Sequence, residues 1–443
     1  MTPNQLINKS YLLYFLLFLF FLIFNGEYFP AYYNASLQIQ MLICGFLFSK
    51  IALSTSQLPA TWISIFSFQL ISSICMRLVN IEFYYDWLGY NPIDAEYYRS
   101  IAEYFQNKDL TSLFSWFNNN LQFDDFGYPF FLVLTTSIFG FDYGLQVMIF
   151  INILFILWGS KYLYRLSCFF TNQHSAKLVA ILWGMMPFAV YTSAVGLKEN
   201  FFVFFIIGAF YFYYKYKFVH KSQYLIFAII FALVTAFFRI PIAYMIIASF
   251  IVSKLFSSHF FRKHQNKIII LLIIVGIISF RFFTSYIMQQ RNLDFDQMSE
   301  IQDSRLQESG GTIAIITNII AALIGPFPSF IATTEKINYI TLYSFSPFLK
   351  MFLSYYALYA IYKALKQKQT IFMPVIIFWA LNSVMLIFTF FTLHDRYQWM
   401  HIPFVLLLAI IGIQKYHTIR HKIKYDKLYL FITIVLIIFF NYR

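Results

Sequence analysis

The chain has 443 residues, of which 60% are hydrophobic and only 12% are charged. Soluble globular proteins carry about 25% charged residues, so this composition excludes a water-soluble enzyme of this length, and the apolar content excludes a disordered chain. The formal net charge of +13 does not indicate a nucleic-acid partner. The acids gather in segments 82–125 and 294–308, whereas Lys and Arg lie in short clusters between apolar runs, which is typical of a membrane protein with basic cytoplasmic loops.

The apolar runs predict an all-α, polytopic integral membrane protein with about 13 transmembrane helices. In chain order the runs are 11–24, 37–48, 61–78, 146–163, 177–194, 201–214, 223–238, 241–252, 268–286, 351–365, 371–392, 402–413 and 429–440. Several are shorter than the roughly 20 residues that a span needs, and we expect aromatic flanks to complete them. No small-x-small cleavage site follows the first run, so we interpret it as an uncleaved span. Cys44, Cys75 and Cys168 lack metal-ligand spacing and are interpreted as packing residues.

Two further apolar stretches, 128–140 and 312–330, determine the predicted topology. If 128–140 crossed the membrane, the basic loops that follow it would face outward. Interpreting both stretches as juxtamembrane or re-entrant helices instead places most Lys and Arg in the cytoplasm and both acidic segments outside. Pro326 and Pro328 interrupt the second stretch, which favours a re-entrant turn over a straight span.

This topology divides the chain into five parts. They are N-terminal transmembrane helices (1–79), a first outer loop with juxtamembrane helices (80–144), a central transmembrane bundle (145–287), a second outer segment with a re-entrant or juxtamembrane helix (288–350) and C-terminal transmembrane helices (351–443). The cytoplasmic connectors are short, and the sequence has neither a P-loop nor a GxGxxG motif. We therefore expect the chemistry on the outer face.

Asp94 is the first candidate for that chemistry. An Asn-Pro turn precedes it, and Tyr97, Ile101, Tyr104 and Phe105 then recur at helical spacing, which predicts an amphipathic helix lying flat on the membrane surface. A carboxylate at the start of this helix could act as general base toward a sugar hydroxyl. The structural alternative is that Asp94 caps the helix by accepting backbone N–H bonds.

Asp124 and Asp125 form a pair of adjacent carboxylates in the same outer loop. Carboxylate oxygens are ligands for divalent metals, so this pair could hold one. Paired acids are also common in solvated loops, which is the alternative interpretation. No other feature of the sequence indicates a cofactor.

Basic side chains in later outer turns are candidates for binding a phosphate. Lys198 lies beside Glu199, and Arg239 precedes a proline in a short turn. His394 and Arg396 lie where a late span emerges. Arg is suited to bidentate phosphate recognition. Pairing of Lys198 within the protein, anchoring of Arg239 at the interface and a local ion pair at Arg396 are the structural alternatives.

The order of these features resembles the membrane-bound GT-C glycosyltransferases, in particular the branch similar to protein and lipid A sugar transferases. The resemblance rests on DAEYY at 94–98, GYP at 127–129, FG at 139–140, Pro187 before LKE at 197–199, and DRY at 395–397 before Pro403. It implies a GT-C-like fold, a polyprenyl-phosphate-linked sugar as donor and an essential Asp in the first outer loop.

Carried over to this sequence, the resemblance implies that Asp94 is catalytic, with Glu96 as its helper. It also implies that Lys198, Arg239 and Arg396 hold the lipid phosphate, and we add Arg99 and His394 as further phosphate-binding candidates. In this chain the acidic loop follows the third span, whereas the family usually has it after the first; two extra N-terminal helices would explain the difference.

We therefore expect a glycosyltransferase at the outer side of a bacterial cytoplasmic membrane, moving a sugar from a polyprenyl-phosphate carrier to a glycan or lipid acceptor. Its partners are that lipid-linked sugar, the acceptor and membrane lipids. Two alternatives stay open. One is an O-antigen or capsular repeat-unit polymerase. The other is a lipid-linked sugar flippase or transporter, although the middles of the apolar runs carry almost none of the charges that a transporter would need.

Overall fold

The structure is a computed structural model that describes residues 2–24, 32–84, 93–106, 108, 110–119, 126–257, 312–330, 339–389, 395–416 and 423–442. Almost all of these residues are helical, and none of the described residues forms a strand. Helices suit such an apolar chain, because a helix satisfies its backbone N–H and C=O groups within the segment that enters the bilayer. The predicted all-α polytopic fold is confirmed.

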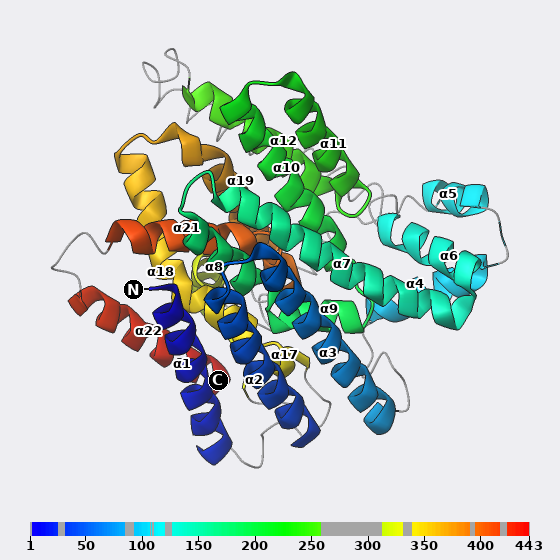
Figure 1. The fold of residues 1–443 in the computed structure, drawn as a ribbon, viewed down its shortest axis with the longest axis horizontal. Helices are drawn as coiled ribbons and strands as arrows, with labels where there is room; N and C mark the ends of the chain where they lie inside the picture. Colours follow the sequence, from blue (N-terminus) through cyan, green and yellow to red (C-terminus); the bar gives the residue numbers. More distant parts are fainter. Residues whose placement is uncertain are drawn as a thin grey trace.

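Three long N-terminal helices lie side by side (Figure 1). They are α1 (Pro3–Phe24), α2 (Tyr32–Ser54) and α3 (Leu58–Tyr84). Gln38 of α2 donates a hydrogen bond to the hydroxyl of Tyr14 at 2.6 Å and another to the carbonyl of Thr341 at 2.6 Å. These buried bonds attach the N-terminal helices to the short helix α17 (Tyr339–Leu342) near the other end of the chain.

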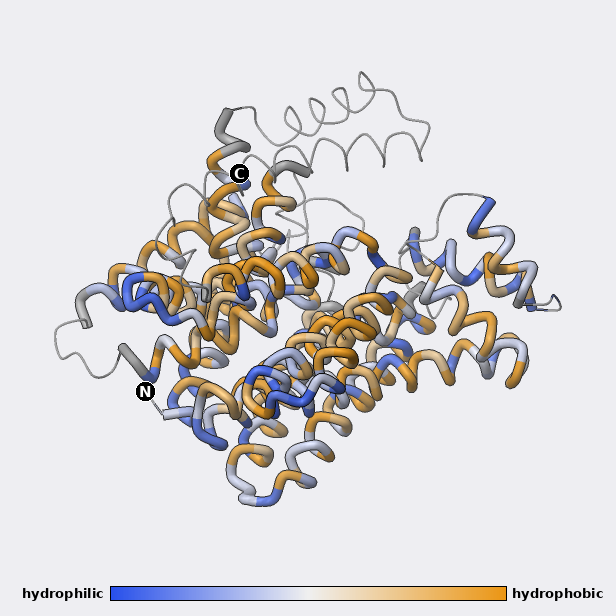
Figure 2. The backbone as a smooth tube through the Cα atoms, turned by 90° about the horizontal axis from the view of Figure 1, so that it is seen from above, coloured by the Kyte–Doolittle hydropathy of each residue, from blue (hydrophilic) through white to orange (hydrophobic). Residues whose placement is uncertain are grey.

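The next three helices form a lobe at one side of the molecule (Figure 1). They are α4 (Ile93–Phe105), α5 (Leu110–Asn119) and α6 (Gly127–Phe139). Hydrophilic residues are frequent on this side (Figure 2). Gly140, with φ of 80°, ends α6, and the chain then turns into α7 (Phe141–Ser167). A Cβ on Gly144 would lie 2.4 Å from the Thr136 Cα, so this glycine allows α6 and α7 to cross closely.

A central bundle and a C-terminal group of helices complete the fold. The central helices are α8 (Gln173–Gly184), α9 (Pro187–Ala194), α10 (Glu199–Val219), α11 (Ser222–Ala236) and α12 (Ile240–Ser257). The C-terminal helices are α16 (Thr312–Leu323), α18 (Phe345–Lys366), η2 (Thr370–Phe372), α19 (Met373–Thr389), α20 (Asp395–Gln398), α21 (Ile402–Tyr416) and α22 (Ile423–Asn441). The fully buried rings of Trp183 and Trp399, stacked at 5.8 Å, link these two groups.

Among the described residues, six helices are long and apolar enough to cross a membrane, and the bent pair α8 and α9 makes a seventh candidate. The six are α1, α2, α3, α7, α10 and η2 with α19, and shorter apolar helices include α6, α11, α12 and α21. Every predicted apolar run except 268–286 lies largely on a helix. Run 268–286 lies outside the described residues.

The predicted run 177–194 is not one straight helix. It divides into α8 and α9, which meet at an angle of 43°. Pro187 is the reason, because its ring removes a backbone donor and starts a new helix at its first position. The break leads the chain to the turn at 195–198, from which α10 begins.

The two stretches that determined the predicted topology both depart from a simple span. Helix α6 has 13 residues, fewer than the roughly 20 that a span needs. In stretch 312–330 the helix α16 ends at Leu323, and residues 325–330 are not helical. The chain break predicted from the prolines is therefore present. Asn441 of α22 holds this non-helical segment by donating to the Pro328 carbonyl at 2.9 Å and accepting from the Phe330 N–H at 2.7 Å.

Helix α4 is amphipathic as predicted, but its buried face differs from the predicted one. The buried side chains are Ala95, Tyr98, Ile101, Ala102 and Phe105. Tyr104, which was expected on the apolar face, is 60% exposed. The reason is that α4 packs against α6, and this neighbour, rather than a flat membrane surface, selects the face that is buried.

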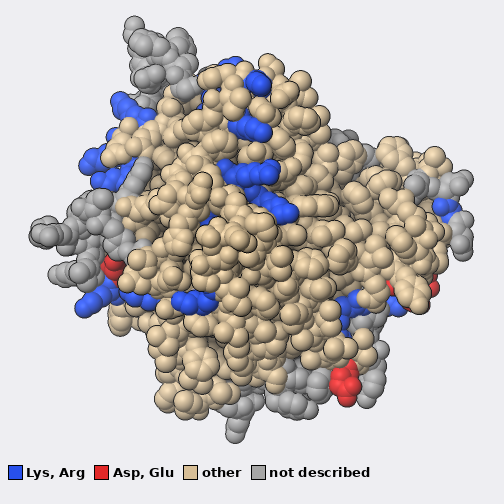
Figure 3. Space-filling model, viewed as in Figure 1, with Lys and Arg blue, Asp and Glu red and all other residues tan. Residues whose placement is uncertain are grey.

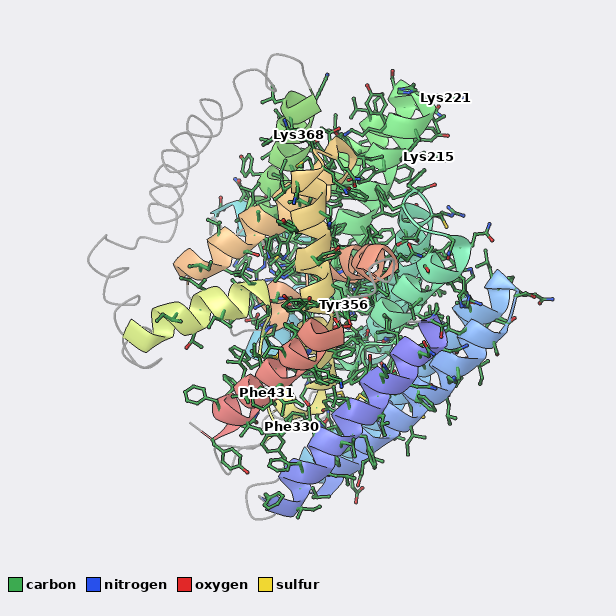
Figure 4. The ribbon with its side chains drawn as sticks, turned by 90° about the vertical axis from the view of Figure 1, so that its left-hand side faces the viewer. Lys215, Lys221, Phe330, Tyr356, Lys368 and Phe431 are labelled. Carbon is green, nitrogen blue, oxygen red and sulfur yellow. The ribbon has the colours of Figure 1, made fainter. Side chains whose placement is uncertain are left out.

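Basic side chains concentrate at one end of the bundle. On the face seen in Figure 3, Lys and Arg gather mostly over the upper left of the molecule. Lys215 and Lys221 near the end of α10 and Lys368 after α18 lie toward the same end in Figure 4. These are residues that the charge pattern predicted to lie together on the cytoplasmic side.

Candidate active site

The Arg396 side chain joins two carboxylates from distant parts of the chain. Its Nη1 lies 2.7 Å from Oδ2 of Asp94. Its Nε donates to Oε1 of Glu199 at 2.7 Å, and its Nη2 lies 2.6 Å from the same oxygen. Because a guanidinium presents several N–H groups in one plane, a single Arg can orient two carboxylates at once. The contact joins α4 of the lobe, α10 of the central bundle and α20 of the C-terminal group.

The cluster is buried at one end and open at the other. The Glu199 side chain is 1% exposed, that of Arg396 28% and that of Asp94 43%. Burial alone would lower the pKa of Arg396, but the carboxylates of Glu199 and then Asp94 outweigh it and hold this pKa well above its ordinary value. Arg396 therefore stays positively charged. Of the two carboxylates, Asp94 is the one that a molecule approaching the protein surface can reach.

The backbone turn before α10 places Glu199 in the cluster. Asn200 donates to the Ala189 carbonyl at 3.1 Å and to Ser193 Oγ at 2.9 Å, and it accepts from Thr192 Oγ1 at 2.9 Å. Glu199 lies in the first turn of α10, where the helix dipole favours a negative charge. Its Oε2 is buried without a hydrogen-bond partner among the described residues, which is a costly state for a carboxylate oxygen.

Two further basic side chains lie beside this cluster. Lys198 precedes Glu199, is 3% exposed and donates to the Phe238 carbonyl at 3.2 Å. Arg239 follows Phe238, and its Cζ lies 4.6 Å from the centre of the Tyr397 ring, which is a cation–π contact. The Arg239 Nε is buried and has no hydrogen-bond partner within the described part of the chain. Lys198 thus fixes the turn that carries Arg239, and Arg239 retains a donor for a ligand.

The buried Tyr98 of α4 faces the acidic cluster. Its ring centre lies 5.2 Å from that of Tyr128 on α6. Burial, and then the charges of Glu199 and Asp94, raise the pKa of Tyr98 well above its ordinary value. The hydroxyl of Tyr98 therefore stays protonated.

A second polar group fixes the segment that carries Arg396. Gln398, two residues further on, is fully buried and donates to the Ala321 carbonyl at 2.9 Å. The ammonium of Lys350, also fully buried, donates to Gln398 Oε1 and to the Gly325 carbonyl. These bonds tie the short helix α20 to the end of α16 and to the non-helical turn after it, so the position of Arg396 depends on that turn.

The structure brings together the two ends of the predicted site. Asp94 and Arg396 form an ion pair, while Lys198 and Arg239 lie on the elements that surround it. Asp94 lies in the first turn of α4, so the helix N-terminus favours its charge, but its described partner is Arg396. One interpretation of the sequence was that Arg396 forms an ion pair with a residue nearby in the chain. In the structure Arg396 does form ion pairs, but its partners, Asp94 and Glu199, are distant in the chain.

Two predicted residues of α4 lie apart from this ion pair. Glu96 is exposed, and a separation of two residues on a helix turns it about 200° from Asp94. The Arg99 Cζ lies 5.9 Å from the centre of the Phe141 ring at the start of α7. Arg99 also lines a small, mostly apolar cavity together with Tyr128 and Gly196.

Three predicted residues lie outside the described residues: His394, Asp124 and Asp125. The suggested metal site at Asp124 and Asp125 therefore stays a prediction. Within the ranges that the structure describes, no group of three or more His, Cys, Asp or Glu side chains could hold a metal ion.

Glu199 and Tyr98 were not among the residues predicted for the site. The signal for Glu199 was present, because an acid beside a lysine at the edge of an apolar run is costly unless it is paired or used. Its partner could not be found from sequence, because Arg396 is almost two hundred positions away. Tyr98 belongs to the DAEYY motif of the resemblance, but the sequence predicted no role for it among the 34 tyrosines of this chain.

Residues 126–286 match the family described as dolichyl-phosphate-mannose-protein mannosyltransferase. The matched segment begins at α6 and contains Lys198, Glu199 and Arg239, whereas Asp94 and Arg396 lie outside it. No curated protein and no solved structure matches the chain significantly. The family match confirms the resemblance to GT-C transferases that use polyprenyl-phosphate sugars, and together with the apolar helices it supports an integral membrane glycosyltransferase.

Proposed function

We propose that this protein transfers a sugar from a polyprenyl-phosphate carrier to a hydroxyl group of a cell-surface glycan or lipid, on the outer face of the cytoplasmic membrane. The observation that carries the proposal is the position of Arg396 between Asp94 and Glu199. One carboxylate of this cluster is buried and the other is accessible. Such an arrangement suits a reaction in which the accessible group accepts a proton and the buried group holds the arginine.

In the proposed reaction Asp94 acts as general base. The acceptor hydroxyl attacks the anomeric carbon of the sugar, its proton passes to the Asp94 carboxylate, and a new glycosidic bond forms. The bond between the anomeric carbon and the phosphate oxygen breaks at the same time, and polyprenyl phosphate leaves with the electron pair. Arg396 orients the Asp94 carboxylate before the acceptor arrives, and the second carboxylate, Glu199, holds the arginine in place.

Arg239 and Lys198 are proposed to stabilise the departing phosphate. Arg239 has an unused buried donor among the described residues and is packed on the Tyr397 ring, next to Arg396. Lys198 holds the turn in front of it through the Phe238 carbonyl. Donors fixed in advance stabilise developing charge more effectively than groups that must reorganise. The resemblance implies that Arg396 holds the lipid phosphate. In the proposed reaction its role is different, because its positive charge is already paired with two carboxylates.

The proposal is tested with Asp94→Asn in cells that lack the native chain. We expect the surface glycan to lack one sugar in these cells, at normal protein levels, and to lack the same sugar in the deletion strain. Glu103→Gln is the matched control, because Glu103 is an exposed acid on the same helix, nine residues away and on the opposite side. A complete glycan in the Asp94→Asn cells would contradict the proposal.

The deletion strain and the purified protein distinguish the transferase from its two alternatives. A repeat-unit polymerase would leave single repeat units when it is deleted, instead of full-length chains that lack one sugar. A flippase would move the lipid-linked sugar across proteoliposomes without forming or breaking a glycosidic bond. Either result would replace the transferase proposal.

A further inference from the structure

An open groove of about 480 Å³ lies between α4 and α5, at the end of α4 away from Asp94. Helix α5 supplies most of its lining: Thr111, Ser112, Ser115, Trp116 and Asn119. Tyr104, Phe105 and Lys108 form the other wall. The groove therefore combines aromatic rings with hydroxyl and amide groups, and the reaction proposed above does not use it.

The sequence of α5 places its polar groups in one stripe. Thr111, Ser115 and Asn119 recur every four residues and so lie on one face of the helix. Leu113 and Phe117 are fully buried on the protein side of α5. These two apolar side chains of α5 are thus used in packing, whereas the polar side chains that line the groove are exposed.

The aromatic rings of the groove are held in place. The Trp116 ring lies edge-on to Phe117, with centres 4.9 Å apart, and edge-on to Phe105 at 6.1 Å. On the opposite wall the Lys108 ammonium lies 3.1 Å from the centre of the Tyr104 ring. A rigid, partly exposed ring next to hydroxyl groups is suited to a ligand that has both an apolar face and many hydroxyls.

We propose that this groove binds the saccharide part of the acceptor. A pyranose can stack its C–H face on Trp116 while its hydroxyls exchange hydrogen bonds with Ser115 and Asn119. This inference rests on the proposed function. Phe105 follows Asp94 by 11 residues of α4, about 16 Å along the helix axis. An acceptor that fills the groove and reaches Asp94 is therefore an oligosaccharide or a glycan chain rather than a single sugar.

The test measures saccharide binding to the full-length chain in lipid nanodiscs, without any sugar donor. The probe is a set of fluorescently labelled oligosaccharides released from the surface polysaccharide of cells that lack this chain. We expect Trp116→Ala to weaken binding roughly tenfold, the loss typical of removing one central aromatic contact. Phe114→Ala is the control, because Phe114 is a 48% exposed ring of α5 that does not line the groove.

Kinetics give a second measurement. Trp116→Ala should raise the KM for the oligosaccharide acceptor roughly tenfold, with kcat and the hydrolysis of the donor in the absence of acceptor unchanged. Unchanged binding by Trp116→Ala, or an equal loss in Phe114→Ala, would overturn the inference. Trp116 fluorescence is obtained as the difference between the wild type and Trp116→Phe. If brominated phospholipids quench this fluorescence and the oligosaccharide does not change it, the groove is a membrane contact and the inference is overturned.

Failure of the inference is distinguishable from failure of the proposed function. A chain that binds the oligosaccharide but transfers no sugar from polyprenyl phosphate would contradict the proposed function and leave the groove assignment standing. A chain that transfers sugar with an unchanged KM for the oligosaccharide acceptor when Trp116 is replaced would do the reverse.

Discussion

Arg396 is the residue on which the geometry of the candidate site depends most, because one guanidinium compensates two carboxylates. Replacing it by Gln leaves Glu199 as a buried charge without its ion-pair partner. We expect Arg396→Gln to lower the free energy of unfolding by about 3 kcal/mol, within the range for breaking a buried pair. Thermal unfolding of the purified protein in detergent measures this loss.

A double-mutant cycle is the control for that prediction. Removing the Glu199 charge as well, in Glu199→Gln with Arg396→Gln, should recover part of the lost stability, because the uncompensated charge is then gone. Strictly additive losses in the two single variants and the double variant would contradict the coupling.

Arg239 is the residue that we expect to affect donor binding. Hydrogen bonds to charged groups contribute about 1.5–3 kcal/mol, so Arg239→Gln should raise the KM for the polyprenyl-phosphate donor roughly ten- to hundredfold. Lys215→Gln removes a positive charge near the other end of α10 and should leave this KM unchanged. Equal effects of the two substitutions would mean that net charge, and not a phosphate contact, determines donor binding.

At the scale of residues, the sequence indicates types of chemistry but not partners. Asp94 and Arg396 were both predicted as site residues, and they do meet. Their contact, and the presence of Glu199 in it, depends on helices that are far apart in the chain. Tyr98 enters the site only because α4 packs against α6, which no local pattern reveals.

At the scale of elements, a glycine allows a close helix crossing in the C-terminal group. Helix α21 packs against α18, and a Cβ on Gly412 would lie 2.0 Å from the Tyr356 carbonyl oxygen. Gly412→Leu must therefore separate the two helices, and we expect it to destabilise the protein by about 1–3 kcal/mol or more. Thermal unfolding in detergent again measures the change.

Val384→Ile serves as the control for added volume, since Val384 on α19 is 48% exposed. We expect it to unfold like the wild type. Gly412→Leu with wild-type stability would show that α18 and α21 do not approach as closely as described.

The apolar runs were sufficient to predict the helices, because a bilayer helix needs a continuous apolar segment and little else. Helix ends were less predictable. The run 177–194 contains Pro187, yet the sequence alone does not give the 43° bend between α8 and α9. The buried face of α4 was predicted only in part, because Tyr104 and Tyr98 have similar character and the choice between them depends on the neighbouring helix.

At the scale of the whole molecule, the proposed function requires the lobe and the basic end to lie on opposite sides of the membrane. The prediction is tested in a chain whose three cysteines are replaced by Ser, with new cysteines at Asn119 or Lys221. A membrane-impermeant maleimide should label Asn119→Cys in intact cells and Lys221→Cys only after permeabilisation. The reverse pattern would place the candidate site on the cytosolic face.

The charge pattern predicted that Lys and Arg between the apolar runs lie together, and Lys215, Lys221 and Lys368 do lie toward one end of the bundle (Figure 4). It could not reveal how the lobe of α4, α5 and α6 packs against the bundle. That packing depends on contacts such as the Gly127 N–H bond to the Phe237 carbonyl at 2.8 Å, which join residues more than one hundred positions apart.

The most direct measurement is turnover of a polyprenyl-phosphate sugar by the purified chain in nanodiscs, with polyprenyl phosphate and glycosylated acceptor both quantified by mass spectrometry. We expect equal amounts of the two products with the wild type, and at least a hundredfold slower formation of both with Asp94→Asn. Wild-type rates with Asp94→Asn, or consumption of a lipid diphosphate in place of the lipid monophosphate, would contradict the proposed function.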